Sequence, residues 1–159
     1  PPKKGRSHVL RIIREILYFE PKGRATNIRV ALDFFSRVTR RKSVAFLISD
    51  FFDKGYEHQL AVAHRRHDLI AVQIEDPREH EWVDVGLLEL EDFETGERRV
   101  VDTSDPTAKR LFERSVVITE QRRKRFFDSI SLDSVKLSTG RPVADGLIRF
   151  FRKRERLRR

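Results

Sequence analysis

Two largely apolar runs constrain the fold of this chain more than any other feature. Residues 44–48 read VAFLI and residues 69–74 read LIAVQI, and neither run alternates apolar with polar side chains. A strand buried on both faces has this pattern, and such strands are usually parallel. The segment 56–67 between them has the apolar spacing of a helix. The order strand, helix, strand with short links predicts a right-handed parallel crossover.

The rest of the chain adds helices, one more strand and a hairpin. The predicted helices cover 7–19, 26–40, about 104–129 and the residues from 142 onward, a strand covers 134–138, and a hairpin joins 85–90 to 98–102. Thr26 or Asn27 is a suitable cap for the second helix. Because Val135 alternates with polar neighbours, its strand is expected near a sheet edge. These elements predict an α/β fold with an antiparallel insertion at about 85–102.

Composition bounds the class of protein. A chain of 159 residues suits one domain, and the lack of cysteine excludes disulfides and thiolate metal sites. The net charge is +9, but residues 149–159 carry +6 and residues 1–6 carry +3, so the body is formally neutral. A dedicated nucleic-acid surface would place its excess charge on the folded body. We therefore interpret the basic tail at 152–159 as a solvated helix end that frays, and expect no nucleic-acid partner.

Motifs of known enzyme classes are missing from the sequence. It contains no G-x-x-x-x-G-K-[ST] loop, no G-x-G-x-x-G after a strand and no G-x-S-x-G elbow. A metal-dependent phosphotransfer enzyme built on Asp50, Asp53 and Asp76 stays an alternative, although it would need a phosphate-cradling loop or a general base. A nucleic-acid-binding protein that uses the basic ends is the other alternative. The sequence favours a protein that is not an enzyme.

Carboxylates follow the two apolar runs. Asp50 and Asp53 come after the first run, and Glu75 and Asp76 come after the second. Ligands of open α/β sheets bind outside the carboxyl ends of the strands, where oxygen ligands would suit Mg²⁺. Helix caps and turns are the simpler interpretation, and spacing alone favours it. The histidines add little, because His64 and His67 lack a third ligand and His80 looks isolated.

Several segments together resemble domain-of-unknown-function family 58. They read GRSHVLRIIREI, ATNIRVALDFFSRVTRRKSVAFLISDFFD, RRHDLIAVQIEDPREHEWVDVGLLELEDFETGE, VVDTSD and IRFFRKR. The resemblance spans nearly the whole chain and implies a von Willebrand factor A-like domain. Its fold would be a Rossmann-like, doubly wound parallel sheet. The chain begins with Pro and contains no Met, so we interpret residues 1–159 as a single domain that is the C-terminal portion of such a fold.

The resemblance also implies a metal-ion-dependent adhesion site. Thr26 would match its Thr and Asp50 its last Asp, with Ser49 and Asp53 as outer partners. The family commonly has Thr-Asp-Leu where this chain has Thr26-Asn27-Ile28. The Asp-x-Ser-x-Ser motif of such sites is absent from all 159 residues, and the family places it upstream. We therefore expect Mg²⁺ in a whole protein and no tight divalent-ion binding by this incomplete set.

The implied function is that of a non-enzymatic interaction module. Family members are typically encoded beside MoxR-type AAA+ ATPases, which implies a role with such an ATPase in protein maturation or assembly. Full-length relatives often carry N-terminal membrane helices, so this portion is expected in the cytoplasm, with an upstream membrane tether. The strand 44–48 would lack its central neighbour. Such an apolar edge recruits other chains, so we expect self-association.

Overall fold

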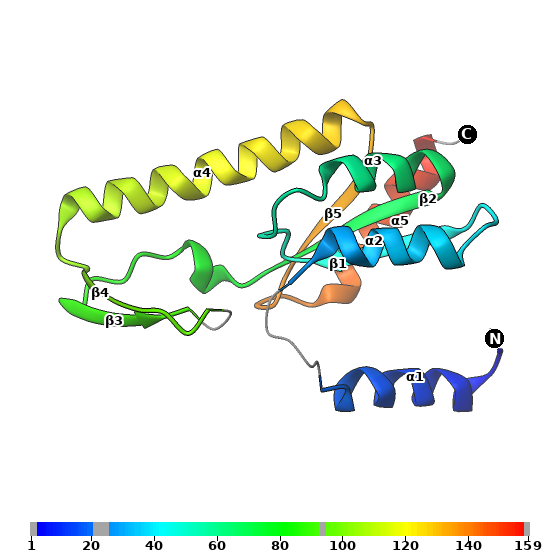
Figure 1. Ribbon diagram of the computed structural model, residues 1–159, viewed down its shortest axis with the longest axis horizontal. Coiled ribbons are helices and arrows are strands. Elements are labelled where there is room, and N and C mark those ends of the chain that lie inside the picture. The colour runs from blue at the N-terminus through cyan, green and yellow to red at the C-terminus, as the bar shows by residue number, and fades with distance from the viewer. Residues whose placement is uncertain (1–2, 21–25, 93–94, 158–159) are drawn as a thin grey trace.

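A computed structural model describes residues 3–20, 26–92 and 95–157 of the chain. Helices and strands alternate along most of it (Figure 1). In chain order they are α1 (Arg6–Tyr18), α2 (Ile28–Val38), β1 (Val44–Ser49), α3 (Glu57–Arg66), β2 (Asp68–Glu75), the 3₁₀ helix η1 (Pro77–His80), β3 (Leu87–Glu91), β4 (Arg98–Asp102), α4 (Pro106–Ser129), β5 (Asp133–Ser138) and α5 (Val143–Leu157). The predicted elements are thus all present, with ends that differ by a few residues.

The main sheet has three parallel strands in the order β1-β2-β5. Phe46 is opposite Ile70 in the first pair, and Val72 is opposite Val135 in the second. The parallel pairing predicted from the two apolar runs is therefore confirmed, as is the edge position of β5. The predicted hairpin is confirmed too, because β3 and β4 form a separate antiparallel pair.

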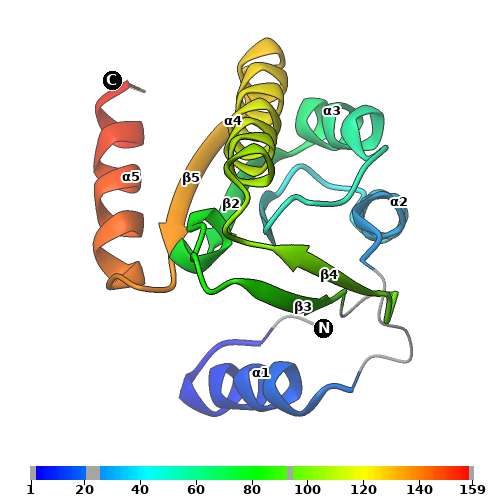
Figure 2. The same cartoon turned by 90° about the vertical axis from the view of Figure 1, so that its left-hand side faces the viewer.

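One face of the sheet is covered by α2 and α3, together with the end of α4 (Figure 2). Helix α2 begins at an Asn27 cap, whose Oδ1 accepts the Val30 N–H at 2.9 Å. The predicted buried side of α3 is correct. Its members are Tyr56, Leu60, Ala63 and His67. The His67 ring packs on Phe35, with 4.7 Å between ring centroids.

Helix α5 covers the other face, so helices lie on both sides of the sheet (Figure 2). Leu147 and Phe150 pack against buried side chains of β2 and β5. The approach is close at Gly146, where a Cβ would lie 2.5 Å from Leu137 Cδ2. A larger residue would push α5 away from the sheet, which explains a glycine in the interior of this helix.

Residues 152–157 continue α5, and the interpretation of 152–159 as a solvated helix end is wrong for Arg154. Arg154 is mostly buried and forms ion pairs with Asp68 and Asp133. These aspartates begin β2 and β5, so one guanidinium fixes the end of α5 to the starts of two strands. The run of basic residues gave no signal that one of them forms ion pairs with acidic residues distant in sequence. Residues 158–159 lie outside the described residues.

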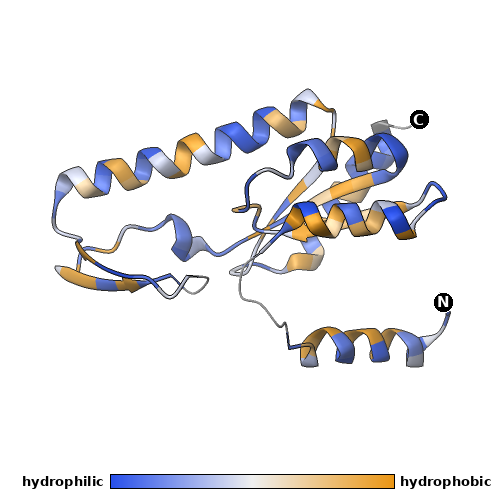
Figure 3. Cartoon of the chain, in the orientation of Figure 1, coloured by the Kyte–Doolittle hydropathy of each residue, from blue (hydrophilic) through white to orange (hydrophobic). Residues whose placement is uncertain are grey.

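The prediction that β1 is buried on both faces is also wrong. Ala45 and Leu47 pack against the core, whereas the opposite face, with Val44, Phe46 and Ile48, is about half exposed or more. The Phe151 ring lies beside this face, with 6.1 Å between its centroid and that of the Phe46 ring. The apolar side of α1 is exposed as well (Figure 3). The apolar residues of β1 and α1 are those of elements buried in a larger core than the one the described residues form.

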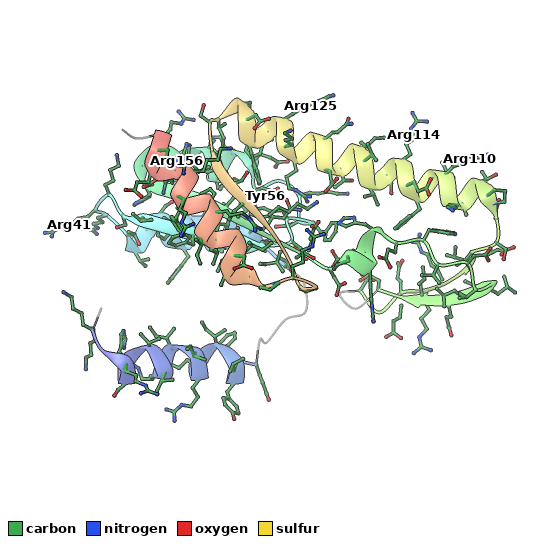
Figure 4. All side chains as sticks on the ribbon, turned by 180° about the vertical axis from the view of Figure 1, so that it is seen from behind. Arg41, Tyr56, Arg110, Arg114, Arg125 and Arg156 are labelled. Carbon is green, nitrogen blue, oxygen red and sulfur yellow. The ribbon has the colours of Figure 1, made fainter. Side chains whose placement is uncertain are left out.

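The hairpin and the first half of α4 extend beyond the sheet as one arm (Figure 1). Trp82 joins them, because its ring packs on Phe112 and its Nε1–H donates to the Thr103 carbonyl at 2.7 Å. Arg110, Arg114 and Arg125 project from α4 away from the body, while Tyr56 lies inside it (Figure 4). The arm therefore brings the inner side of α4 over the carboxyl ends of the strands.

Candidate functional site

The loop after β1 presents Asp50 at the carboxyl end of the sheet. The Phe51 N–H donates to Ser49 Oγ at 3.0 Å, and the Phe52 N–H donates to Asp50 Oδ1 at 3.1 Å. Phe51 has a left-handed backbone, with φ of 61°, which is unfavourable for a non-glycine residue. Burial of its ring against Tyr56 and Phe127 compensates for that strain. The loop is thus anchored to the core by Phe51, while the Asp50 side chain stays exposed.

Asp53 connects this loop to the start of α2. Its Oδ2 accepts the Ile28 N–H at 2.7 Å, and its Oδ1 accepts the Lys54 N–H at 2.7 Å. The capping interpretation expected Asp53 to cap the helix that follows it. The structure shows instead that Asp53 caps α2. Because Thr26 lies two residues before Ile28, this bond fixes the segment of Thr26 to the segment of Asp50. Ser49 lies beside Asp50, and its hydroxyl donates to Asp50 Oδ1 at 3.3 Å.

These residues fit Mg²⁺ in the type of donor but not in number. Thr26 and Asp50 offer oxygen atoms, as a hard cation requires. One oxygen of Asp50 already accepts two hydrogen bonds, and both carboxylate oxygens of Asp53 accept backbone N–H groups. Among the described residues, Thr26 and Asp50 are too few ligands for such an ion, and the expectation of no tight divalent-ion binding stays a prediction.

A second group of charged side chains lies where β2 ends. Glu75 and Glu120 both bind the Lys136 ammonium, at 2.6 Å for Glu75, and His80 Nε2 lies 3.1 Å from Glu75 Oε2. His80 is therefore not isolated, contrary to the prediction. Ligand atoms of the two glutamates and the histidine lie within 4.8 Å of one another. Lys136 occupies the position between the carboxylates, so the group is an ion-pair network.

The pKa shifts follow from this network. The pKa of Glu120 is lowered, chiefly because Lys136 donates a hydrogen bond to its carboxylate. Burial alone would lower the pKa of Lys136, but the hydrogen bonds to Glu120 and Glu75 outweigh it, and the pKa is raised. Nearby, burial raises the pKa of Tyr56 to about 12, so its hydroxyl stays protonated in the core.

We expect Lys136→Met to reduce stability in a pH-dependent way. Because the pKa of Glu120 is lowered in the folded state, it contributes stability at pH values above its unfolded-state pKa. This stability is lost as the pH falls through the folded-state pKa. Because the pKa of Lys136 is raised in the folded state, it contributes stability at pH values below its unfolded-state pKa. This stability is lost as the pH rises through the folded-state pKa. More than a third of both side chains is exposed, so the cost at neutral pH should be about 0.5–1 kcal/mol.

Urea denaturation at several pH values checks this expectation. The difference between wild type and Lys136→Met should shrink below about pH 4 and above about pH 10. Lys109→Met, at an exposed position on α4, should show no such profile. A difference that stays constant across the acid limb would mean that the ion pairs do not account for the effect.

Sequence reasoning missed Arg123, which α4 places beneath the β1 loop. This residue is 8% exposed, and its Nη1–H donates to the Asp50 carbonyl at 3.2 Å. It lies at one end of a hollow of about 240 Å³ between the β1 loop, η1 and α4. The lining residues are Phe52, Glu79, His80, Phe112, Ser115, Val116, Thr119, Glu120 and Arg123. Its helical spacing with Val116, Glu120 and Phe127 was the one available signal of burial.

Comparisons with known proteins find uncharacterized mycobacterial relatives. The chain is 30% identical to the uncharacterized protein Mb1516 of Mycobacterium bovis, over 98% of this chain and 50% of that protein. The uncharacterized protein Rv1480 of Mycobacterium tuberculosis matches to the same extent. The uncharacterized protein MAV169 of Mycobacterium avium is 28% identical over 98% of this chain and 94% of its own length. This chain thus spans about half the length of the first two relatives.

Three further findings complete the comparison. No solved structure gives a significant match. Among the described residues, no helix is long and apolar enough to cross a membrane. A family model described as "Protein of unknown function DUF58" matches residues 1–123, which is more than half of the chain. The chain therefore belongs to the DUF58 family, as the resemblance predicted.

Proposed function

We propose that this chain is part of a von Willebrand factor A-like interaction module without enzymatic activity. The observation that carries the proposal is the exposed Asp50 carboxylate at the carboxyl end of a parallel strand, on a loop fixed by Phe51. Open α/β sheets bind their ligands at this edge. A fixed acidic side chain there is suited to recognition, and the sequence carries no motif of a catalytic class discussed above.

The whole protein would complete the site. Thr26 and Asp50 would then be joined by the upstream Asp-x-Ser-x-Ser motif and would hold Mg²⁺, which would attract an acidic residue of the partner. The uncovered face of β1 supports this idea, because a further strand and helix would bury Val44, Phe46 and Ile48. In this proposal the module works in the cytoplasm with a MoxR-type AAA+ ATPase in protein maturation or assembly, tethered through an upstream segment.

The proposal predicts that Asp50→Ala in the full-length protein abolishes capture of the ATPase. Tagged wild-type protein should retain a MoxR-type ATPase from the same organism in the presence of Mg²⁺, and EDTA should release it. Loss of one charged ligand at a metal-bridged contact should weaken binding at least about a hundredfold, which corresponds to about 2.8 kcal/mol. Quantitative co-purification or surface plasmon resonance would measure the change.

A matched variant is Asp33→Ala, which removes an exposed carboxylate from α2 and should leave capture unchanged. Circular dichroism should show both variants folded, because Asp50 contacts only its own loop through its side chain among the described residues. Equal capture of the ATPase by wild type and Asp50→Ala would refute the proposed role of this edge.

A further inference from the structure

We propose that Arg123 and the hollow beside it form a subsite that binds the carboxylate of an acidic side chain from a partner protein. This inference rests on the proposed function, since it assigns a second recognition element next to Asp50. It differs from the metal-dependent contact in its chemistry, because here a guanidinium of this chain meets the carboxylate directly.

The first step is the state of Arg123. A guanidinium carries five N–H donors and is always charged, yet the described residues give Arg123 a single hydrogen bond, to the Asp50 carbonyl. It forms no ion pair with any carboxylate in the described part of the chain. A charge that is more than nine-tenths buried is costly unless it is paired. Arg123 therefore has unused capacity for a planar, bidentate partner such as a carboxylate.

The acidic neighbours do not satisfy this demand. Glu120 binds the Lys136 ammonium, and the Glu79 carboxylate accepts the Asp76 N–H in the capping box of η1. Glu75 binds both Lys136 and His80. The charge of Arg123 helps to lower the pKa of Glu120, but among the described residues no glutamate forms an ion pair with the guanidinium. The N–H donors of Arg123 that the Asp50 carbonyl does not use are therefore left for an incoming ligand.

The walls of the hollow indicate what accompanies the carboxylate. Phe52 and Phe112 supply aromatic surface to the hollow, and Phe52 is 53% exposed although it lies beside the core. Thr119 places a hydroxyl one turn before Arg123 on α4. The volume of about 240 Å³ is below the roughly 300–1,000 Å³ of sites that enclose a whole small molecule. It suits one or two side chains of a protein ligand, an acidic one with an apolar neighbour.

The position of the subsite connects it with the rest of the edge. Because Arg123 binds the Asp50 carbonyl, the hollow lies next to the loop that presents the Asp50 side chain. A partner segment that crosses the carboxyl ends of the strands would meet both. Sequence reasoning about strand ends alone gives only the acidic half of this arrangement, and α4 supplies the basic half.

The test titrates the ¹⁵N-labelled chain with a blocked Phe-Asp dipeptide in buffer with EDTA, followed by NMR. We expect saturable shifts in the Ser49–Phe52 loop and in α4 around residues 112–123, with millimolar affinity. The Phe-Asn analogue should bind at least about tenfold more weakly. Acetate alone should also bind more weakly, because it lacks the aromatic contact. Equal binding of the Asp and Asn peptides would overturn the subsite, and acetate as tight as the dipeptide would overturn the assignment to a protein ligand.

Two variants locate the site. Arg123→Met should reduce dipeptide affinity at least about tenfold, while Arg125→Met, which changes an outward-facing arginine of the same helix, should not (Figure 4). If Arg123→Met fails to fold, Phe52→Ala keeps the core and should still weaken binding several-fold; unchanged binding would overturn the proposal. The dipeptide titration contains EDTA and therefore does not depend on a metal. If the wild-type chain failed to bind the dipeptide but the full-length protein still captured the ATPase, the subsite alone would be refuted. Retained dipeptide binding without capture would refute only the proposed function.

Discussion

Replacing Arg154 with Met will lower the free energy of unfolding by about 2–4 kcal/mol. The guanidinium is 11% exposed and binds Asp68 and Asp133, at 2.7 Å for Nε to Asp133 Oδ2. Breaking a fully buried pair costs about 3–5 kcal/mol because the partner charge is left unpaired. Asp133 is nearly half exposed, so solvent compensates part of its loss. Since the pair holds the end of α5 on the starts of β2 and β5, α5 should also loosen.

Chemical denaturation and amide hydrogen exchange measure the two effects. Exchange in the last two turns of α5 should speed up more than exchange in α3, which packs on the opposite face. Arg152→Met removes an exposed arginine of the same helix and should change stability by less than about 0.5 kcal/mol. If Arg154→Met behaved like Arg152→Met, the ion pairs would not be what holds this end of the helix.

The fold was predictable where one local pattern decides the structure. The apolar runs around Leu47 and Ile70 predict parallel strands, and β1 and β2 pair in parallel, although only β2 lies between two strands of the described sheet. Asp105 before Pro106 predicts the start of α4, and its Oδ1 accepts the Thr107 N–H. Such signals depend only on residues a few positions apart, so they predict a strand or a helix start without knowledge of the tertiary structure.

The candidate site was predictable only in part, because its contacts join residues distant in sequence. Asp50 could be placed at a strand end from its neighbours alone. Arg123 binds the Asp50 carbonyl across 73 positions of the chain, and Arg154 binds Asp68 across 86. Both arginines lie in runs of charged residues, and the sequence of such a run alone predicts exposure to solvent. His80 gains its contact with Glu75 when η1 folds back beside β2, and ligand atoms of both residues then lie within 4.8 Å of one from the distant Glu120.

The uncovered edge of the sheet leads to the second prediction with a large effect, that the chain self-associates. In the described residues β1 pairs only with β2, so its other edge has free backbone donors and acceptors. The adjacent side chains of Val44, Phe46 and Ile48 are 58%, 47% and 65% exposed. An apolar strand edge of this kind is a template for pairing with a second chain. Sedimentation or light scattering should show oligomers whose population rises with protein concentration.

Phe46→Lys should shift this equilibrium toward the monomer. Burial of a Phe side chain contributes about 1.5–3 kcal/mol, so the dissociation constant should rise at least about tenfold. A lysine at a strand edge also opposes pairing through charge repulsion between copies. Val100→Lys on the hairpin is the matched variant, since Val100 is 68% exposed and should leave the equilibrium unchanged. A wild-type chain that stays monomeric at high concentration would contradict the prediction, and dissociation by Val100→Lys alone would place the interface on the hairpin.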